Sequence, residues 1–183
     1  MVDTSFRHPA VSSLTHDSPY LPANVRFLLS HYTTYVIHSL SGLPQTKAPW
    51  KGIHVPCALA TYGELDVTGQ SSFARVSLLY SLLSLTCYHL GTLYDGSSTT
   101  TAGRTEPMLS TEQAENSQYW YSRGVKYRDI ARTAFQKYLQ TLSEGLPERV
   151  KYKEVFASAM SLICAGVCLP VVVNAMEFCT VQC

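Results

Sequence analysis

Residues 116–168 constrain the fold most, because they hold two apolar patterns of helical period separated by one short break. In the first half, apolar side chains recur every three or four residues, which places them on one face of a helix. The members of this face are Trp120, Tyr127, Ile130, Ala131, Ala134, Phe135, Tyr138, Leu139 and Leu142. The corresponding residues of the second half are Val150, Val155, Phe156, Ala159, Met160, Ile163 and Cys164. We predict two antiparallel helices that pack on each other and need a third layer to cover them.

Local signals indicate where these two helices begin and end. Ser110 and Gln113 form a capping-box pattern at the start of the first helix. Gly145 is predicted to end this helix and Pro147 to begin the second. Glycine is favoured just past a helix end, and proline is favoured in the first turn.

Two shorter helices are predicted nearer the N-terminus. The first covers residues 22–40, and its apolar face consists of Val25, Leu28, Leu29, Tyr32, Val36 and Leu40. The following loop, residues 41–52, contains Trp50, which is expected to anchor it on the core. A short helix over residues 55–63 is predicted to place Leu59 and Tyr62 inward, and residues 64–70 are predicted to form a polar turn.

The predicted helix at residues 71–94 is apolar on nearly all sides. Phe73, Val76, Leu79, Leu82, Leu83, Leu90 and Leu93 recur at helical spacing, and Leu78, Tyr80 and Leu85 fill the other faces. A helix of this kind lies either at the centre of a bundle or within a membrane. Arg75, His89 and several serines and threonines favour the bundle.

These elements predict an all-α fold, an irregular antiparallel bundle of about five helices in one domain over residues 22–168. Residues 1–21 are expected to form a disordered leader, and the Ser-, Thr- and Gly-rich residues 95–110 a flexible internal loop. Residues 169–183 form an atypical tail, because Pro170 is expected to stop the helix and residues 171–173, all valine, favour a strand.

The composition limits the classes of function. Hydrophobic residues make up 46% of the chain and charged residues only 15%, so we expect exposed apolar surface that is covered either by a partner or by a missing segment. The net charge of +1 lacks the basic excess typical of nucleic-acid binding. The N-terminal residues lack the cationic start and following apolar run of a secretory signal. The six cysteines are therefore expected to be reduced thiols.

Cysteine and histidine pairs are the candidates for metal or redox chemistry. Cys164 with Cys168, and Cys179 with Cys183, have C-x3-C spacing, which suits helix cross-links or zinc. The first pair lies in an apolar run without basic neighbours, which favours buried, inert thiols. Two further pairs are not expected to bind metal. His31 and His38 lie two turns apart on a helix rather than at the i,i+4 spacing usual for ligands, and His8 and His16 are expected to be bystanders.

Charged groups give no clear catalytic pattern. Glu64 and Asp66 form an acidic pair that is expected to be solvated on a turn. The basic cluster of Arg123, Lys126, Arg128 and Arg132 suits a phosphate or an acidic partner, although a solvated helix face is the favoured interpretation. The sequence contains no nucleotide-binding, hydrolase or metalloprotease motif, so no catalytic, cofactor or metal residues are predicted and the chain is expected not to be an enzyme.

A membrane anchor is an alternative for the C-terminal region. Residues 155–176 contain no charge and follow Arg149, Lys151 and Lys153, which suits a tail anchor with its positive side in the cytoplasm. Several small and polar residues lower the hydrophobicity of this segment, which counts against insertion.

Four stretches carry a family resemblance. They are residues 27–59, which contain a Pro-Trp dipeptide, residues 72–94, which contain His89-Leu90-Gly91, residues 117–139, with Trp120 and a Gly-x-x-Tyr step, and residues 146–167, with Lys151-Tyr152-Lys153. Their order and spacing resemble the fungal-specific transcription factor domain, the regulatory domain of fungal binuclear-zinc-cluster factors, and most closely the subset that includes regulators of arginine metabolism. The likeness covers about residues 21–167 and none of its motifs is catalytic.

The resemblance implies an all-helical, nuclear domain that regulates transcription through protein partners, as a homodimer or a hetero-complex or with the transcription machinery. Members of this family normally carry a separate zinc module that binds DNA, but Cys57, Cys87, Cys164, Cys168, Cys179 and Cys183 lack its spacing. No direct DNA binding, cofactor or metal is therefore expected of this chain. The alternatives are the tail anchor over residues 155–176 and a small helical enzyme of a biosynthetic pathway.

Overall fold

The computed structural model describes residues 24–41, 49–95, 111–145 and 151–180. The first helical segment is α1 (Val25–His31), continued by a π-helical turn (Tyr32–Val36) and α2 (Ile37–Ser41). A second π-helical turn (Trp50–His54) leads into α3 (Val55–Thr68). The long helices are α4 (Phe73–Tyr94), α5 (Thr111–Ser143) and α6 (Tyr152–Thr180). The described residues form five helical segments and no strand, which confirms the predicted all-α bundle.

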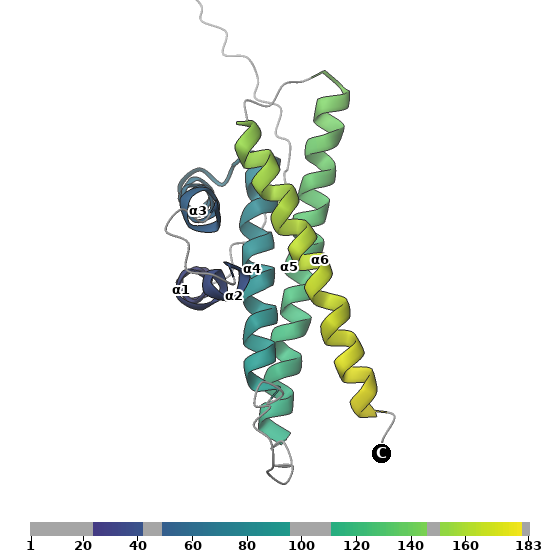
Figure 1. Cartoon of the computed structure of the whole chain (residues 1–183). Coiled ribbons are helices and arrows are strands. Elements are labelled where there is room, and N and C mark those ends of the chain that lie inside the picture. The colour runs from purple at the N-terminus through teal and green to yellow at the C-terminus, as the bar shows by residue number, and fades with distance from the viewer. Residues whose placement is uncertain (1–23, 42–48, 96–110, 146–150, 181–183) are drawn as a thin grey trace, which may run out of the picture.

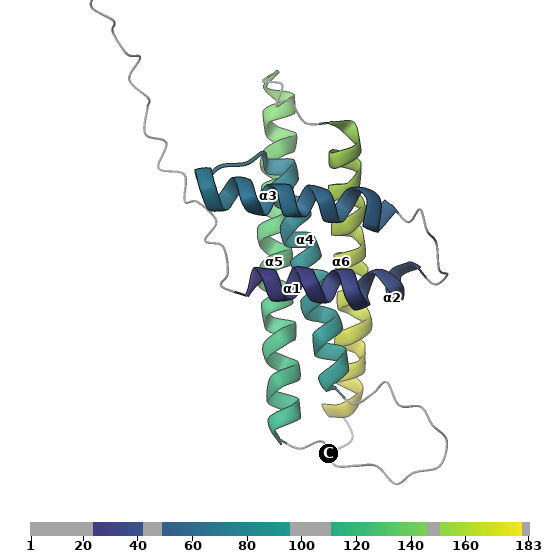
Figure 2. The ribbon, with the colours of Figure 1, turned by 90° about the vertical axis from the view of Figure 1, so that its left-hand side faces the viewer.

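The three long helices form the body of the molecule (Figure 1), and α4 lies between α5 and α6 in the view of Figure 2. α5 runs antiparallel to α4, and α6 crosses both as it returns in the direction of α4 (Figure 1). The segments containing α1–α2 and α3 lie side by side across one face of α4, roughly perpendicular to it (Figure 2). Both α5 and α6 contact α4 more extensively than they contact each other. The organising element is therefore α4 and not the predicted α5–α6 pair.

α4 is central because its sequence offers no polar face. Every residue from Val76 to Tyr88 is buried, including three serines and one threonine. Ser72 caps its N-terminus by accepting a hydrogen bond from the Arg75 backbone N–H at 3.3 Å. A helix that is apolar all round must be covered on every side, so its neighbours assemble around it. The prediction that residues 71–94 form the central helix is confirmed.

Small residues bring α4 and α5 together at two matching points. The ring of Tyr121 on α5 covers Gly91 on α4, and the ring of Tyr88 on α4 covers Gly124 on α5. Ser117 Oγ donates a hydrogen bond to the Gly91 carbonyl at 3.1 Å. Each glycine thus leaves room for a tyrosine ring of the opposite helix.

The helix predicted for residues 55–63 is longer than the sequence indicated. α3 continues to Thr68 and ends at Gly69, whose φ of 68° is the left-handed conformation that favours glycine, so the predicted polar turn at residues 64–70 is wrong for most of its length. Leu59 is 52% exposed rather than inward, and Leu65 one and a half turns later is buried instead. Tyr62 packs on the core as expected, and Trp50 does so from the π-helical turn rather than from a loop.

The predicted end of α6 is also wrong. The helix continues through Pro170 and residues 171–173 to Thr180, where the sequence suggested a stop and a strand. Proline removes one backbone hydrogen bond, and valine is less favourable than alanine in a helix by less than about 1 kcal/mol. In this long apolar segment neither effect ends the helix. The end of α5 was predicted well, because α5 stops at Ser143 and Gly145 has a φ of 72°.

Several predictions fall outside the described residues. They concern the leader at residues 1–21, nearly all of the loop at residues 95–110, the capping residue Ser110, and Pro147 and Val150. The side chains of Gln113 and of residues 168–183 likewise lie outside the described part of the chain.

Candidate functional site

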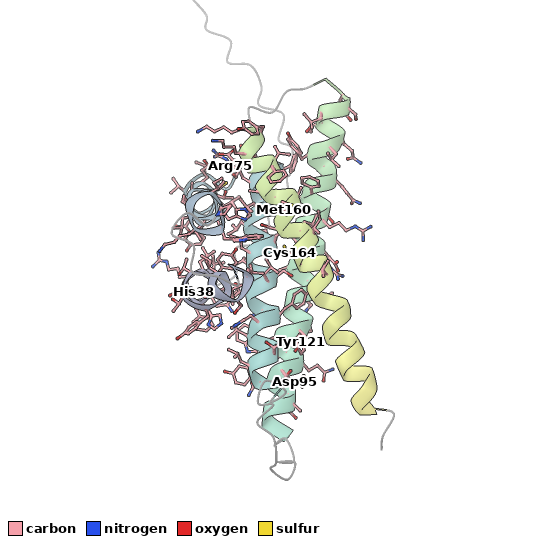
Figure 3. All side chains as sticks on the ribbon, in the orientation of Figure 1. His38, Arg75, Asp95, Tyr121, Met160 and Cys164 are labelled. Atoms are coloured by element: carbon pink, nitrogen blue, oxygen red, sulfur yellow. The ribbon has the colours of Figure 1, made fainter. Side chains whose placement is uncertain are left out.

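Arg75 joins three helices near one end of the bundle (Figure 3). Its guanidinium donates two hydrogen bonds to the Glu154 carboxylate on α6, at 3.0 and 3.1 Å, and another to Glu64 on α3. Hydrogen bonds from Ser71 and from Arg75 lower the pKa of Glu64, and Glu154 with Glu64 raises the pKa of Arg75. Glu64 is therefore a structural ion-pair partner and not half of the solvated acidic pair that was predicted.

His54 is a buried polar residue that sequence reasoning missed. Its side chain is only 4% exposed, its Nδ1 lies 2.9 Å from the Ser161 hydroxyl on α6, and its ring lies 4.4 Å from the Trp50 ring. Burial lowers its pKa to about 4, so the imidazole is neutral near pH 7. The contact links the π-helical turn before α3 to α6.

His31 has a different partner from the one considered in the sequence. Its Nε2 lies 3.0 Å from Nδ1 of His89 on α4, whereas His38 is exposed on α2. Burial lowers the pKa of both His31 and His89, which favours two neutral rings that share one hydrogen bond. Among the described residues, no group of three His, Cys, Asp or Glu side chains is arranged to hold a metal ion.

The structure divides the basic cluster of α5. Arg123 donates hydrogen bonds to the Tyr119 and Tyr127 hydroxyls and, at 3.1 Å, to the Asn24 side chain next to α1. Its guanidinium also lies over both tyrosine rings. Arg123 thus joins α5 to α1 instead of forming a phosphate site. Arg128 pairs with its neighbour Asp129, at 3.2 Å.

The cysteines do not form a reactive or metal-binding group within the described residues. Burial raises the pKa of Cys57, Cys87 and Cys164, so these thiols are protonated and poorly nucleophilic near pH 7. The thiols of Cys57 and Cys87 are buried and that of Cys164 is half-buried. This agrees with inert behaviour for Cys164, while the side chains of Cys168, Cys179 and Cys183 lie outside the described residues.

The surface of α6 differs from the prediction and is the best candidate for a functional site. The fully buried residues of α6 are small, namely Ala157, Ser158, Ser161 and Ala165, and the partly buried Leu162 and Cys164 also pack on the core. The large apolar residues of the predicted inner face point outward instead, at Phe156, Met160 and Ile163, together with Val167. On α5, Ile130, Leu139 and Leu142 are also exposed, contrary to prediction. Large apolar side chains exposed at several positions along one helix suit a binding face.

Within the described part of the chain, α4 is the helix whose length and composition suit a membrane span. The bundle buries most of α4, including every residue from Val76 to Tyr88, as expected for the core helix of a folded domain. The segment considered as a tail anchor, residues 155–176, is described in its side chains only as far as Val167.

Comparison with known proteins identifies a family and a relative. Residues 27–175 match the family described as the fungal specific transcription factor domain. The chain is 31% identical over 137 residues to arginine metabolism regulation protein II of Saccharomyces cerevisiae. This match covers 75% of the chain but only 13% of the yeast protein, so the chain spans a small part of that relative. No solved structure matches the chain significantly.

Proposed function

The chain belongs to the fungal-specific transcription factor domain family, and from this premise we propose that it regulates transcription in the nucleus through contacts with other proteins. The family match over residues 27–175 carries the proposal. The name of the yeast relative suggests control of metabolic genes. In this proposal the domain is a regulator and not a catalyst.

We propose that protein contacts, rather than DNA contacts, are the means of action. Three arginines already donate hydrogen bonds within the chain. Arg75 and Arg128 bind carboxylates, and Arg123 binds tyrosine hydroxyls and the amide of Asn24. These arginines are therefore paired within the chain, and the net charge of the whole sequence is only +1. Both observations indicate that the chain attracts the phosphates of DNA only weakly. The exposed apolar side chains of α6 supply the kind of surface that proteins bind.

A tethering experiment tests this function. The full chain is fused to an unrelated DNA-binding module, and a reporter gene downstream of that module's site is measured in fungal cells. We expect the fusion to raise or lower reporter output relative to the module alone. A matched fusion with Gly124→Leu, which disrupts the α4–α5 contact, should lose the effect.

Two results would count against the proposal. One is a folded, nuclear fusion that leaves the reporter unchanged. The other is sequence-selective, salt-sensitive binding of DNA by the purified chain in a gel-shift assay, which would make the domain a direct reader of DNA.

A further inference from the structure

Two histidine side chains from different helices meet where α1 lies across α4 (Figure 2). Nε2 of His31 lies 3.0 Å from Nδ1 of His89, and the centroids of the two rings are 5.2 Å apart with their planes tilted by 57°. Both side chains are half-buried, so solvent reaches the pair. The proposed function makes no use of this contact between two ring nitrogens.

Both rings are held in place by their surroundings. The His31 ring lies beside Phe27, one turn before it, and Tyr35, one turn after it, with ring centroids 6.1 and 4.8 Å away. His89 belongs to the core helix α4, and its neighbours Tyr88 and Leu90 are buried. Side chains on rigid helices hold a binding geometry better than side chains on loops do. The two nitrogens are therefore positioned before any ligand arrives.

The distance between these nitrogens suits a shared metal ion. Imidazole is the commonest metal ligand, and it binds zinc at about 2.0–2.1 Å. Two nitrogens on one tetrahedral zinc ion are then about 3.3 Å apart, so the pair would open by only roughly 0.3 Å. In a neutral pair, one facing nitrogen carries a proton and the other accepts it. On metal binding that proton moves to the outer nitrogen of the same ring, and both facing nitrogens offer a lone pair.

We propose that His31 and His89 bind one zinc ion, with water in its remaining positions, and that the ion fastens α1 to α4. Imidazole nitrogen suits zinc, whereas magnesium and calcium prefer oxygen ligands. Structural zinc sites have four protein ligands, so a site with two is open and should bind with micromolar affinity. The site is independent of the proposed function, because zinc binding does not require the domain to regulate transcription.

Calorimetric titration of the purified full chain with Zn²⁺ tests the proposal. His31→Gln and His89→Gln should each weaken this binding by at least about tenfold, since each removes a ligand. His38→Gln is the matched control, because His38 (labelled in Figure 3) is an exposed histidine of α2, and it should bind zinc as the wild type does. Zinc at a hundred times its dissociation constant should raise the melting temperature of the wild type by about 5–10 °C. It should leave that of His31→Gln nearly unchanged, and Mg²⁺ should shift neither.

Nuclear magnetic resonance of the wild type, labelled with ¹⁵N in histidine, identifies the ligands without any variant. Zinc should move the signals of His31 Nε2 and His89 Nδ1 to those of metal-bound nitrogen and leave the His38 signals in place. This measurement decides the matter even if His89→Gln fails to fold, which circular dichroism would reveal. Zinc binding that is unaltered in His31→Gln, or His31 and His89 signals that zinc does not move, would overturn the proposal.

Discussion

Replacing Gly124 by alanine is expected to destabilise the domain, although alanine is normally the better helix residue. A Cβ atom added at Gly124 would lie 2.5 Å from Cε1 and 2.7 Å from Cδ1 of the Tyr88 ring. Tyr88 is only 2% exposed, so its ring is held by its neighbours and has little room to move. The strain must therefore be relieved by displacing α5 from α4.

The size of the effect is a difference between two contributions. An extra carbon in a packed core typically costs about 1–3 kcal/mol. The change from glycine to alanine within a helix stabilises it by about 1 kcal/mol. We expect a net loss of about 1 kcal/mol, which lowers the melting temperature by about 2–4 °C in a chain of this length.

Gly63→Ala on α3 is the matched control for Gly124→Ala. Gly63 also lies within a helix, but a Cβ added there has no atom within 4 Å. Only the helix contribution applies, so this variant should gain up to about 1 kcal/mol. Urea denaturation followed by circular dichroism measures both variants beside the wild type. If Gly124→Ala stabilises the chain as Gly63→Ala does, the close contact between α4 and α5 is not present in solution.

Three further predictions concern buried groups. The pKa of His54 is about 4 in the folded chain and 6.5 ordinarily, so the unfolded chain takes up this proton at a higher pH than the folded chain does. The free energy of unfolding should therefore fall by up to about 3 kcal/mol as the pH falls from 6.5 to 4. His54→Gln should remove this pH dependence when stability is measured by urea denaturation. Arg75→Met leaves the nearly buried Glu154 unpaired and should cost about 3 kcal/mol in the same assay, whereas Arg128→Met, which affects a surface pair, should cost less than about 1 kcal/mol. Cys164 should react with a thiol reagent at pH 7 more slowly than free cysteine, and a rate equal to that of free cysteine would show an exposed thiolate.

The central position of α4 was predictable because its residues leave no alternative. A helix without a polar face has to be buried on all sides, and this requirement does not depend on which partners cover it. The end of α5 was predictable for a similar reason, since a residue with positive φ at the break is most readily glycine. Sequence patterns of this kind predict the structure reliably, because they do not depend on how the other helices are placed.

The orientation of α6 was not predictable, because its sequence carries two apolar faces. Periodicity alone identifies an apolar face and favours the one with larger side chains, here Phe156 and Ile163. The structure instead buries the face of Ala157 and Ser161 in the bundle, where Ser161 contacts His54. With almost no charge along the helix, no polar face fixes its rotation about its own axis.

The buried polar contacts could not be predicted from the sequence for another reason. His54 and Ser161 are 107 residues apart, and Glu64 and Glu154 meet only because Arg75 lies between their helices. None of these residues stands in a local pattern that would indicate its partner. Such contacts depend on how whole helices are placed, and that placement is decided by the packing around α4.

Transcript levels in cells test the central claim most directly. The experiment uses two variants of the protein, each expressed at its natural level. The double variant Phe156→Glu with Ile163→Glu changes the exposed side of α6, and the control Leu59→Glu changes an exposed residue of α3. We predict that the double variant remains folded and alters the abundance of a defined set of transcripts, whereas Leu59→Glu leaves them as in the wild type. If RNA sequencing finds the transcripts of the double variant unchanged, the domain does not regulate transcription through this surface.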